Sequence, residues 1–479
     1  MSKLFVGREK EQQQLLEYIN SEQSEFIAVY GRRRVGKTFL IQKVVGRKYA
    51  FYVAGMNNVP LALQLSNFMK GIKGYDFKKN PVRTWLDAFV VLEQYLEKLP
   101  DGNKIVFIDE MPWMDTPRSN FISGLEHFWN SWASWRDDIK LIVCGSATSW
   151  IINNLIKNRG GLHNRVTHKI PLKPFTLKEC QEYFAASGFR LSTKQIAECY
   201  MVLGGVPFYL SKMDKGQSVA QNIDRLLFEP EGELRGEFQS LYNSLYKNAA
   251  NHIKIVTALA TKGKGLSRQE IIEKTALPDN GKFSLMLSEL ESCGFVRCYR
   301  PFLAAKSSSF SRQSADALYQ LVDPFTLFYF QVMWNADAND SNFWSNCQTS
   351  HFFSTWSRLS FEMLCLNHSE QIKDALGISG VSANVFSWFG KGENRAAQID
   401  MLIDRADSTI NVCEMKYYNK PYLMTAADQE DIERKLSTFV ESTGTVKNII
   451  MTLITLKGLD RNEYSECIQR ELTLDDLFR

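Results

Sequence analysis

One glycine-containing stretch near the N-terminus constrains the fold more than any other part of the chain. Residues 26–30 (Phe-Ile-Ala-Val-Tyr) form an apolar run of strand length, and Gly-Arg-Arg-Arg-Val-Gly-Lys-Thr follows at residues 31–38. Gly31 and Gly36 permit a tight turn, and the helical pattern that begins near Lys37 would direct its first backbone amides at an anion. The stretch therefore predicts a Walker A phosphate-binding loop between a buried strand and a helix.

The polar groups of the predicted loop have separate expected roles in nucleotide binding. Backbone N–H groups of about residues 34–38 would surround the β-phosphate of a nucleotide, Lys37 would neutralise β- and γ-phosphate oxygens, and the Thr38 hydroxyl would bind Mg²⁺. The expected nucleotide-binding residues are Gly31, Arg32, Arg33, Arg34, Val35, Gly36, Lys37, Thr38 and Phe39. The alternative is an ordinary loop that matches the pattern by chance.

The composition describes an ordinary globular protein of several domains. The 479 residues suggest two to four domains, with 44% hydrophobic and 23% charged residues. The apolar runs have strand length and the N-terminus lacks the apolar segment of a signal peptide, so we expect a cytoplasmic protein without membrane contact. The nine cysteines form no CxxC pair, which favours buried reduced thiols. A net charge of +4 permits a nucleic-acid partner without requiring one.

A second apolar run ends in two acids. The sequence Lys-Ile-Val-Phe-Ile-Asp-Glu at residues 104–110 follows the glycine loop by about 70 residues and predicts a Walker B strand. Asp109 would hold Mg²⁺, usually through water, and Glu110 would orient and polarise the attacking water. Alternating helix and strand patterns between the two motifs predict a parallel sheet covered on both faces. The alternative is that the two acids cap the following turn.

Two further segments carry candidates for contact with the γ-phosphate. After the apolar run at 141–145, Ser146 is the expected sensor, with Thr148 or a plain turn as the alternative. On the glycine-containing loop at 158–165, Arg159 and Arg165 could reach γ-phosphate charge in their own subunit or in a neighbouring copy of a homo-oligomer. Arg165 is our choice, and a surface salt bridge is its alternative.

Four motifs together resemble the predicted archaeal and bacterial ATPase family within the AAA+/STAND branch of P-loop NTPases. They are Gly-Arg-Arg-Arg-Val-Gly-Lys-Thr, Phe-Ile-Asp-Glu-Met-Pro-Trp, Cys-Gly-Ser-Ala-Thr and Leu-Gly-Gly-Val-Pro-Phe-Tyr-Leu. The resemblance implies a helical lid over about residues 174–238 that folds over the nucleotide, with Gly204, Gly205 and Pro207 as its motif. Gly7-Arg8-Glu9 resembles the box that precedes Walker A in such ATPases, although a capped helix start would give the same residues.

The pattern of elements changes after residue 240. The expected elements are a helix at 252–260, a helix that opens with a capping box at 267–270, a helix at 282–293, and strands at 295–299 and 317–322. This is winged-helix order, and DNA binding with Arg297 and Arg300 on the wing side is one interpretation. The candidate recognition helix carries Lys282 against Glu289 and Glu291, so a domain-docking module is an equal alternative.

The last third of the chain contains a second candidate site. Residues 398–403 and 409–417 have strand patterns, and the period of two places Glu414 and Lys416 on one face, where the preceding strand can bring Asp400 beside them. Two carboxylates can share a divalent ion and a lysine can hold or activate water, which suits hydrolysis of a phosphodiester. A solvated Glu–Lys pair on a surface strand is the alternative.

The spacing Asp-x13-Glu-x-Lys resembles the PD-(D/E)xK nuclease fold over roughly residues 352–478, a domain that the same ATPase family often carries. The resemblance implies Mg²⁺, or possible Mn²⁺, at Asp400 and Glu414. It also implies Glu362 as the helix acid, at the edge of an apolar arc formed by Leu359, Met363 and Leu366 in the helix expected at 356–372. Gln398 and Lys435 would be accessory groups. Gln-Ile-Asp replaces the Pro-Asp of the motif, so cleavage of DNA and binding without cleavage both stay open.

The predicted fold class is α/β. The expected parts are a P-loop ATPase core with a parallel sheet at 1–173, a helical lid at 174–240, a winged-helix domain at 241–322, a linker at 323–345 and a restriction-endonuclease-like domain at 346–479. Within the linker, the aromatic segment 323–334 should be a packed inter-domain helix. We expect an ATP- and Mg²⁺-dependent ATPase associated with DNA. The alternative is a nucleotide-dependent switch whose C-terminal domain binds a partner protein or DNA without cleaving it.

Overall fold

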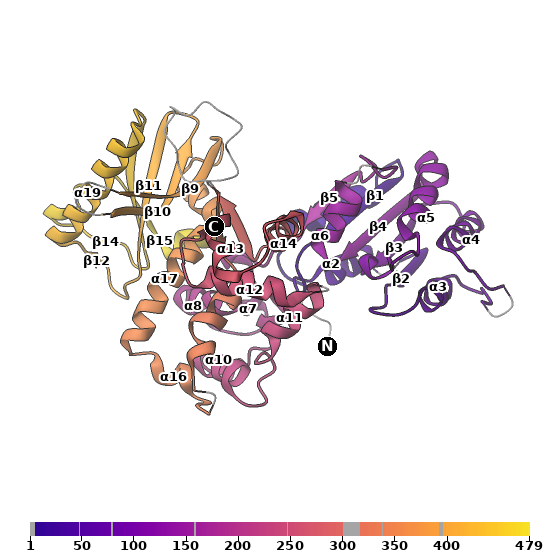
Figure 1. Cartoon of the computed structure of the whole chain (residues 1–479), viewed down its shortest axis with the longest axis horizontal. Coiled ribbons are helices and arrows are strands. Elements are labelled where there is room, and N and C mark those ends of the chain that lie inside the picture. The colour runs from indigo at the N-terminus through magenta and orange to yellow at the C-terminus, as the bar shows by residue number, and fades with distance from the viewer. Residues whose placement is uncertain are drawn as a thin grey trace. The chain divides into compact units, whose positions relative to one another are not determined.

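The chain forms two compact units, residues Met1–Pro174 and Phe175–Arg479. The structure is a computed structural model (Figure 1). It describes residues 5–46, 48–77, 80–157, 160–246, 248–299, 317–337, 339–391 and 396–479.

The first unit is built on a five-stranded parallel sheet of order β2-β3-β4-β1-β5. The strands are β1 (Glu25–Tyr30), β2 (Phe51–Ala54), β3 (Lys104–Asp109), β4 (Ile139–Gly145) and β5 (His168–Pro171). Alternate residues of β1 enter different cores: Phe26 and Ala28 pack on one face, Ile27 and Val29 on the other. Because both faces are buried, the strands are almost continuously apolar, as the sequence predicts.

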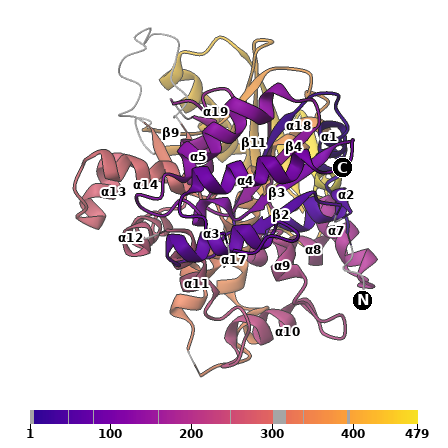
Figure 2. The same cartoon turned by 90° about the vertical axis from the view of Figure 1, so that its right-hand side faces the viewer.

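Helices cover both faces of this sheet. They are α1 (Glu9–Ile19), α2 (Lys37–Val45), α3 (Leu61–Lys70), α4 (Trp85–Glu97), η1 (Met111–Trp113), α5 (Phe121–His127), η2 (Phe128–Trp132), η3 (Ala133–Trp135), α6 (Thr148–Ile151) and η4 (Ile152–Ile156). Helices α3, α4 and α5 lie over one face of the sheet (Figure 2), where their side chains share its core. Side chains of α1 and α2 share a core with the other face. The carboxyl ends of β3, β4 and β1 are neighbours, so the residues that follow these strands meet at one edge.

The second unit begins with helices. They are α7 (Leu177–Ala186), α8 (Thr193–Leu203), α9 (Pro207–Leu210), α10 (Val219–Ile223), η5 (Asp224–Phe228) and α11 (Glu237–Leu245). Gly205 has φ 65°, and its carbonyl accepts a hydrogen bond from the Phe175 amide at 2.7 Å. A Cβ atom at Gly205 would lie 2.3 Å from the Phe175 carbonyl oxygen. Glycine is therefore required where α8 turns against the first residue of the unit.

A small three-stranded antiparallel sheet of order β6-β8-β7 follows. The elements are α12 (Ala249–Ala260), β6 (Leu266–Ser267), α13 (Arg268–Thr275), α14 (Gly281–Ser292), β7 (Val296–Tyr299) and β8 (Leu318–Leu321). Ser267 and Glu270 form the expected capping box at the start of α13. Arg300 lies outside the described residues.

The C-terminal part carries a mixed sheet of order β15-β13-β11-β10-β9, antiparallel from β9 to β11 and parallel from β11 to β15. Its elements are α15 (Pro324–Gln331), η6 (Met333–Asn335), α16 (Phe343–Cys347), α17 (His351–Asn367), α18 (Ser369–Ala375), β9 (Ala383–Lys391), β10 (Ala396–Arg405), β11 (Thr409–Lys416), β12 (Tyr422–Leu423), α19 (Ala426–Thr443), β13 (Asn448–Thr455), β14 (Leu459–Asp460), η7 (Glu463–Ser465), β15 (Arg470–Thr473) and η8 (Leu474–Phe478). Helix α19 lies on the crossover that joins the parallel strands β11 and β13 (Figure 1).

The structure corrects two expectations for this part. The segment 323–345 is not a linker, because Phe325 and Phe328 of α15 are fully buried, as expected of a packed helix. The helix expected at 356–372 is two helices separated at His368, and Leu359 is 46% exposed, so it does not belong to the buried arc. Phe361 and Cys365, both fully buried, are part of that arc in its place.

All nine cysteines, which lie in the described part of the chain, are thiols outside disulfide bonds, in agreement with the sequence interpretation. Among the described residues, no helix is long and apolar enough to cross a membrane.

Candidate functional site

The loop after β1 has the backbone geometry that its glycines predict. Gly31 has φ 148°, and a Cβ atom there would lie 2.1 Å from the Leu172 carbonyl oxygen. Gly36 has φ 93° and stands at the N-terminus of α2. Below the loop, Val35 and Leu40 pack with Leu172 in a small core. The start of α2 is thereby fixed, with its first amides at the carboxyl edge of the sheet.

Lys37 is buried beneath this loop. Its Nζ donates hydrogen bonds to the carbonyl oxygens of Gly31 at 2.8 Å and Arg32 at 2.9 Å. The ammonium group thus lies against the loop backbone that the sequence assigns to the phosphates.

Thr38 and Asp109 meet at the same edge. The Thr38 hydroxyl donates to both carboxylate oxygens of Asp109, at 3.1 and 3.0 Å. A hydroxyl and a carboxylate are hard oxygen ligands of the kind that Mg²⁺ prefers, so this pair fits the ion. The structure therefore brings together the two residues that the sequence assigns to the metal.

Asp109 has two further hydrogen bonds. Its Oδ1 accepts from the Glu110 amide at 2.9 Å and from the Cys144 thiol at 2.7 Å. Burial, together with the negative charge of Asp109, raises the pKa of the Cys144 thiol well above its usual value. Cys144 is therefore a neutral donor that orients the carboxylate.

Glu110 is turned toward the end of β4. Its backbone has φ 44°, in the left-handed region. Its Oε2 accepts from the Ser146 amide at 3.0 Å, and the Ser146 hydroxyl lies 2.9 Å from both carboxylate oxygens. Two adjacent strands thus place the candidate base and the candidate sensor in direct contact.

The other residues that the sequence suggests for this site differ in burial and in hydrogen-bond partners. Thr148 is buried, and its hydroxyl donates to the Ser146 carbonyl at 3.5 Å. Arg165 is exposed, and its role at the γ-phosphate stays a prediction. Arg159 lies outside the described residues. Arg8 is buried and donates to the Lys173 carbonyl at 2.5 Å, which joins the segment before α1 to the end of the unit.

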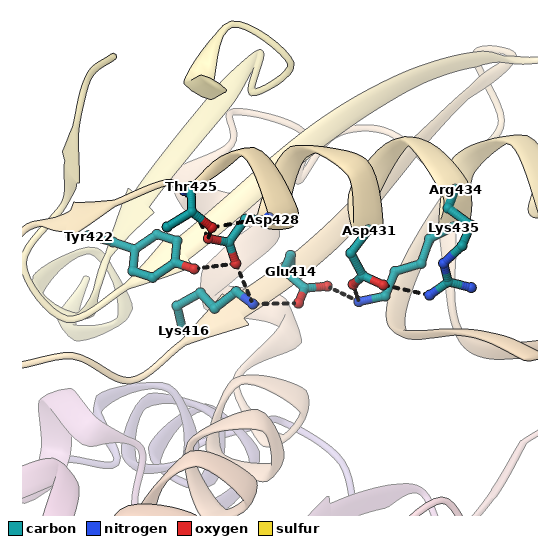
Figure 3. Close-up of polar contacts among 8 residues, drawn as sticks. All are labelled: Glu414, Lys416, Tyr422, Thr425, Asp428, Asp431, Arg434 and Lys435. Carbon is teal, nitrogen blue, oxygen red and sulfur yellow. Dashed lines mark hydrogen bonds and ion pairs between the residues drawn. The ribbon is translucent and has the colours of Figure 1, made fainter. Parts of the chain in front are cut away.

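The second candidate site lies between β11 and α19, where acidic and basic side chains alternate (Figure 3). Lys416 is 3.2 Å from Glu414 Oε1 and 3.9 Å from Asp428. Lys435 of α19 is 3.1 Å from Glu414 Oε2 and 2.9 Å from Asp431. Burial by itself would lower the pKa of Lys435, but the negative charges of Glu414 and Asp431 have the larger combined effect and raise this pKa. Glu414 and Lys416 share a face, as predicted, and each Glu414 oxygen has its own lysine.

Glu362 and Asp400 complete the acidic cluster, which we define as Glu362, Asp400 and Glu414. Burial, followed by the charges of Asp400 and Glu414, raises the pKa of Glu362 to about 8. Burial also raises the pKa of Asp400, with an opposing hydrogen bond from Gln398 and a further contribution from Glu414. The three carboxyl groups predicted from α17, β10 and β11 are therefore close enough for the charge of one to raise the pKa of another.

The carboxylates of the acidic cluster have contacts with other protein groups. Throughout the described part of the chain, no group of three or more His, Cys, Asp or Glu side chains is placed to hold a metal ion. Glu414 is engaged by two lysines, and Asp400 Oδ1 accepts from Gln398 Nε2. The expected ion at Asp400 and Glu414 therefore stays a prediction that these contacts do not favour.

Two contacts connect this site to other parts of the second unit. Tyr417, directly after Lys416, donates to Glu198 of α8 at 2.9 Å. Arg297 of β7 donates to Gln320 at 2.6 Å and to Ser387 of β9 at 3.0 Å. For Arg297, these contacts favour domain docking, the second of the two interpretations that the sequence left open.

The comparison with known families agrees with the geometry of the first site. Residues 5–213 match a family described as an ATPase domain predominantly from Archaea. Over these residues the chain is therefore similar to an ATPase domain. A Methanocaldococcus jannaschii protein described as uncharacterised is 27% identical over 336 residues, which are 69% of this chain and 69% of that protein.

Solved structures show more distant similarity to the chain. A Walker-type ATPase of Pyrococcus abyssi has 15% sequence identity and a TM-score of 0.49, and the match covers 68% of this chain and 96% of that one. The ORC2 protein of Aeropyrum pernix has 15% identity and a TM-score of 0.32, with 76% and 97% covered.

Sequence reasoning missed two contacts of the first unit: the hydrogen bond from Cys144 to Asp109 and the hydrogen bond from Arg8 to Lys173. Cys144 was interpreted only as a buried thiol, although its place two residues before Ser146 puts it at the end of β4, beside β3. The bond from Arg8 to Lys173 joins residues far apart in the sequence, and no local pattern indicates it.

Proposed function

We propose that the ATPase domain hydrolyses ATP with Glu110 as the group that orients and polarises the attacking water. The contact between Glu110 and Ser146 supports this role most directly, because it holds a carboxylate at the carboxyl edge of the sheet, beside the Thr38–Asp109 pair. A bound Mg²⁺ would supply positive charge at the phosphates and would be held by Thr38 and Asp109.

Residues of the chain bind the phosphates and hold the two carboxylates in place. The first amides of α2 and the Lys37 ammonium bind phosphate oxygens, and Lys37 exchanges its carbonyl partners for them. Cys144 and the Glu110 amide hold Asp109 in one orientation. Ser146 does the same for Glu110, so that the carboxylate can accept hydrogen bonds from water without reorganising.

The test is Glu110→Gln, with Asp101→Asn as the matched control. Asp101 is an exposed acid that precedes β3, whereas Glu110 follows it. We expect Glu110→Gln to bind ATP with unchanged affinity and to lose hydrolysis by about 10²-fold or more, as when a general base is removed. Asp101→Asn should hydrolyse ATP normally. If Glu110→Gln hydrolyses ATP at the rate of the unaltered protein, Glu110 only caps the turn and has no role in hydrolysis.

We further propose that the second unit associates with DNA through a PD-(D/E)xK-like C-terminal domain. The interaction among the three carboxyl groups of the acidic cluster, beside Lys416, supports this assignment. The winged-helix order of α12 to β8 is a second feature in its favour.

Cleavage and binding without cleavage predict different results for this domain. The lysine pairs of Glu414 favour binding without cleavage, because two ammonium groups already neutralise the carboxylate that a metal would need. The decisive assay is nicking of a supercoiled plasmid by the purified chain with Mg²⁺ or Mn²⁺, compared with Glu414→Gln. Nicking that Glu414→Gln abolishes establishes a nuclease. DNA binding without nicking establishes the alternative, a nucleotide-dependent switch.

A further inference from the structure

The tyrosine loop, residues 417–423, follows β11 and ends with β12. Its last part is held by Tyr422, whose amide donates to the Gly458 carbonyl at 2.8 Å where β12 pairs with β14. The Tyr422 hydroxyl donates to Asp428 Oδ1 at 2.7 Å (Figure 3). Tyr422 is buried, so hydrogen bonds at its backbone and at its ring fix the end of the loop to β14 and α19.

A second tyrosine of this loop is exposed. Tyr418 is 53% exposed, and its ring centroid lies 5.0 Å from that of Tyr422, at an interplanar angle of 41°. Leu423, at the end of the loop, is 57% exposed. Among the described residues, neither Tyr418 nor Leu423 belongs to a hydrophobic core. Core packing therefore does not account for these side chains, and the supported Tyr418 ring is accessible for stacking.

Lys416 links the tyrosine loop to the second candidate site. Its Nζ lies 5.7 Å from the centroid of the Tyr422 ring and 3.2 Å from Glu414 Oε1. Asp428 contacts both partners, because it accepts the hydrogen bond from Tyr422 and lies 3.9 Å from Lys416. The tyrosine loop is therefore continuous with the residues that resemble a nuclease site.

Lysine residues give the surface around this loop a positive charge. Lys420 lies within the tyrosine loop, and Lys457 lies between β13 and β14. Both lysines are exposed, and neither forms an ion pair within the described residues. Over the tyrosine loop and residues 457–460, these two lysines outnumber the one acid, Asp460. The charge of this surface therefore suits a partner that carries phosphate groups.

We propose that the tyrosine loop binds an unpaired DNA base, so that the DNA recognised by the C-terminal domain contains a single-stranded segment. The Tyr418 ring stacks on the base, and Lys420 contacts an adjacent phosphate. Bases inside a duplex are stacked on their neighbours and do not present this face to a side chain. The inference rests on the proposed DNA association and adds the form of DNA that is bound.

The experiment compares Tyr418→Ala with Trp135→Ala in the full chain, because Trp135 is an exposed aromatic residue of the first unit. A fluorescein-labelled oligothymidylate and a duplex of the same length are titrated by fluorescence anisotropy, in EDTA and without nucleotide. We expect Tyr418→Ala to weaken binding of the single strand by roughly 5- to 150-fold, the effect of losing one base–aromatic stack. Its binding of the duplex should not change. Tyr418→Phe and Trp135→Ala should bind both DNAs as the unaltered chain does.

Titrations at several salt concentrations separate the ring from the lysine. Because stacking involves no charged group, Tyr418→Ala should keep the slope of log affinity against log salt. Lys420→Ala should reduce this slope by about 0.7, the loss of one phosphate contact to a single strand.

Three results would overturn the inference. Equal binding of the single strand by Tyr418→Ala and Trp135→Ala removes the stacking role while DNA association stands, and it favours a protein partner for the exposed ring. An equal loss for the duplex in Tyr418→Ala removes the selection of single strands. Absence of binding by the unaltered chain overturns DNA association and this inference with it. Tyr418→Leu, which keeps an apolar side chain without an aromatic face, repeats the comparison if the melting temperature of Tyr418→Ala is lowered.

Discussion

Ser146→Ala tests whether the hydroxyl group orients the catalytic carboxylate or senses the phosphate. The hydroxyl lies 2.9 Å from both oxygens of Glu110, and the amide that remains in the variant lies 3.0 Å from Oε2. A hydrogen bond to a charged group contributes about 1.5–3 kcal/mol. Because one of the two donors remains, we expect a loss near the lower limit, about 1.5 kcal/mol, which is roughly tenfold in rate.

The assay is steady-state ATP hydrolysis together with an equilibrium titration of ATP. If Ser146 acts through Glu110, kcat falls roughly tenfold and the affinity for ATP changes by less than about twofold, because the amide and the hydroxyl of Ser146 both contact Glu110. Thr148→Val is the matched control, since it removes the neighbouring hydroxyl at a similar volume. A loss in Thr148→Val as large as in Ser146→Ala, or a fall in ATP affinity as large as the fall in kcat, would refute the orienting role.

Two further predictions concern the stability of the second unit. Gly205→Ala should destabilise it by more than about 1 kcal/mol in urea unfolding, because φ is 65° and the new Cβ would lie 2.3 Å from the Phe175 carbonyl. His368 should make the unit sensitive to acid, since burial, opposed by a hydrogen bond to Leu364, lowers its pKa from 6.5 to about 4. The unfolded chain then binds more protons, so stability should fall as pH falls from 6.5 to about 4, by about 3 kcal/mol in total.

Each of these predictions has a control in the same unit. Gly236→Ala adds a methyl group where nothing lies within 4 Å and φ is −90°, so it should change stability far less than Gly205→Ala. An equal loss of stability in Gly205→Ala and Gly236→Ala would show that the close approach of residue 205 to Phe175 does not matter for stability. His368→Gln should flatten the dependence of unfolding free energy on pH in that window. A slope that persists in this variant would assign the acid sensitivity to other groups.

The fold of the first unit could be predicted because its signals are local. Apolar runs before Gly31 and Asp109 are sufficient to indicate buried parallel strands, and strands of one parallel sheet place their ends at one edge. The meeting of Thr38 with Asp109, and of Glu110 with Ser146, follows from that rule.

The second unit was less predictable because long-range packing decides it. The apolar pattern of the helix expected at 356–372 includes Leu359. In the structure Leu359 is exposed, whereas Phe361 and Cys365 are buried against residues from distant parts of the sequence. Hydrogen bonds from Tyr299 and Gln320 fix the turn at Gly263 and Lys264, and a bond from Ser387 joins β9 to β10, and no spacing in the sequence indicates these contacts.

The core shared by α8 and α17 limits how the chain can be divided. Tyr200 of α8 packs edge-on against His368 at 4.9 Å, and Glu198 of the same helix accepts the hydrogen bond from Tyr417. A fragment that begins near Ser345 would expose the apolar side of α17 to water and leave the Tyr417 hydroxyl without its acceptor. Recombination at the start of the C-terminal domain would therefore produce an aggregation-prone piece, whereas an exchange between Pro174 and Phe175 would leave each hydrophobic core whole.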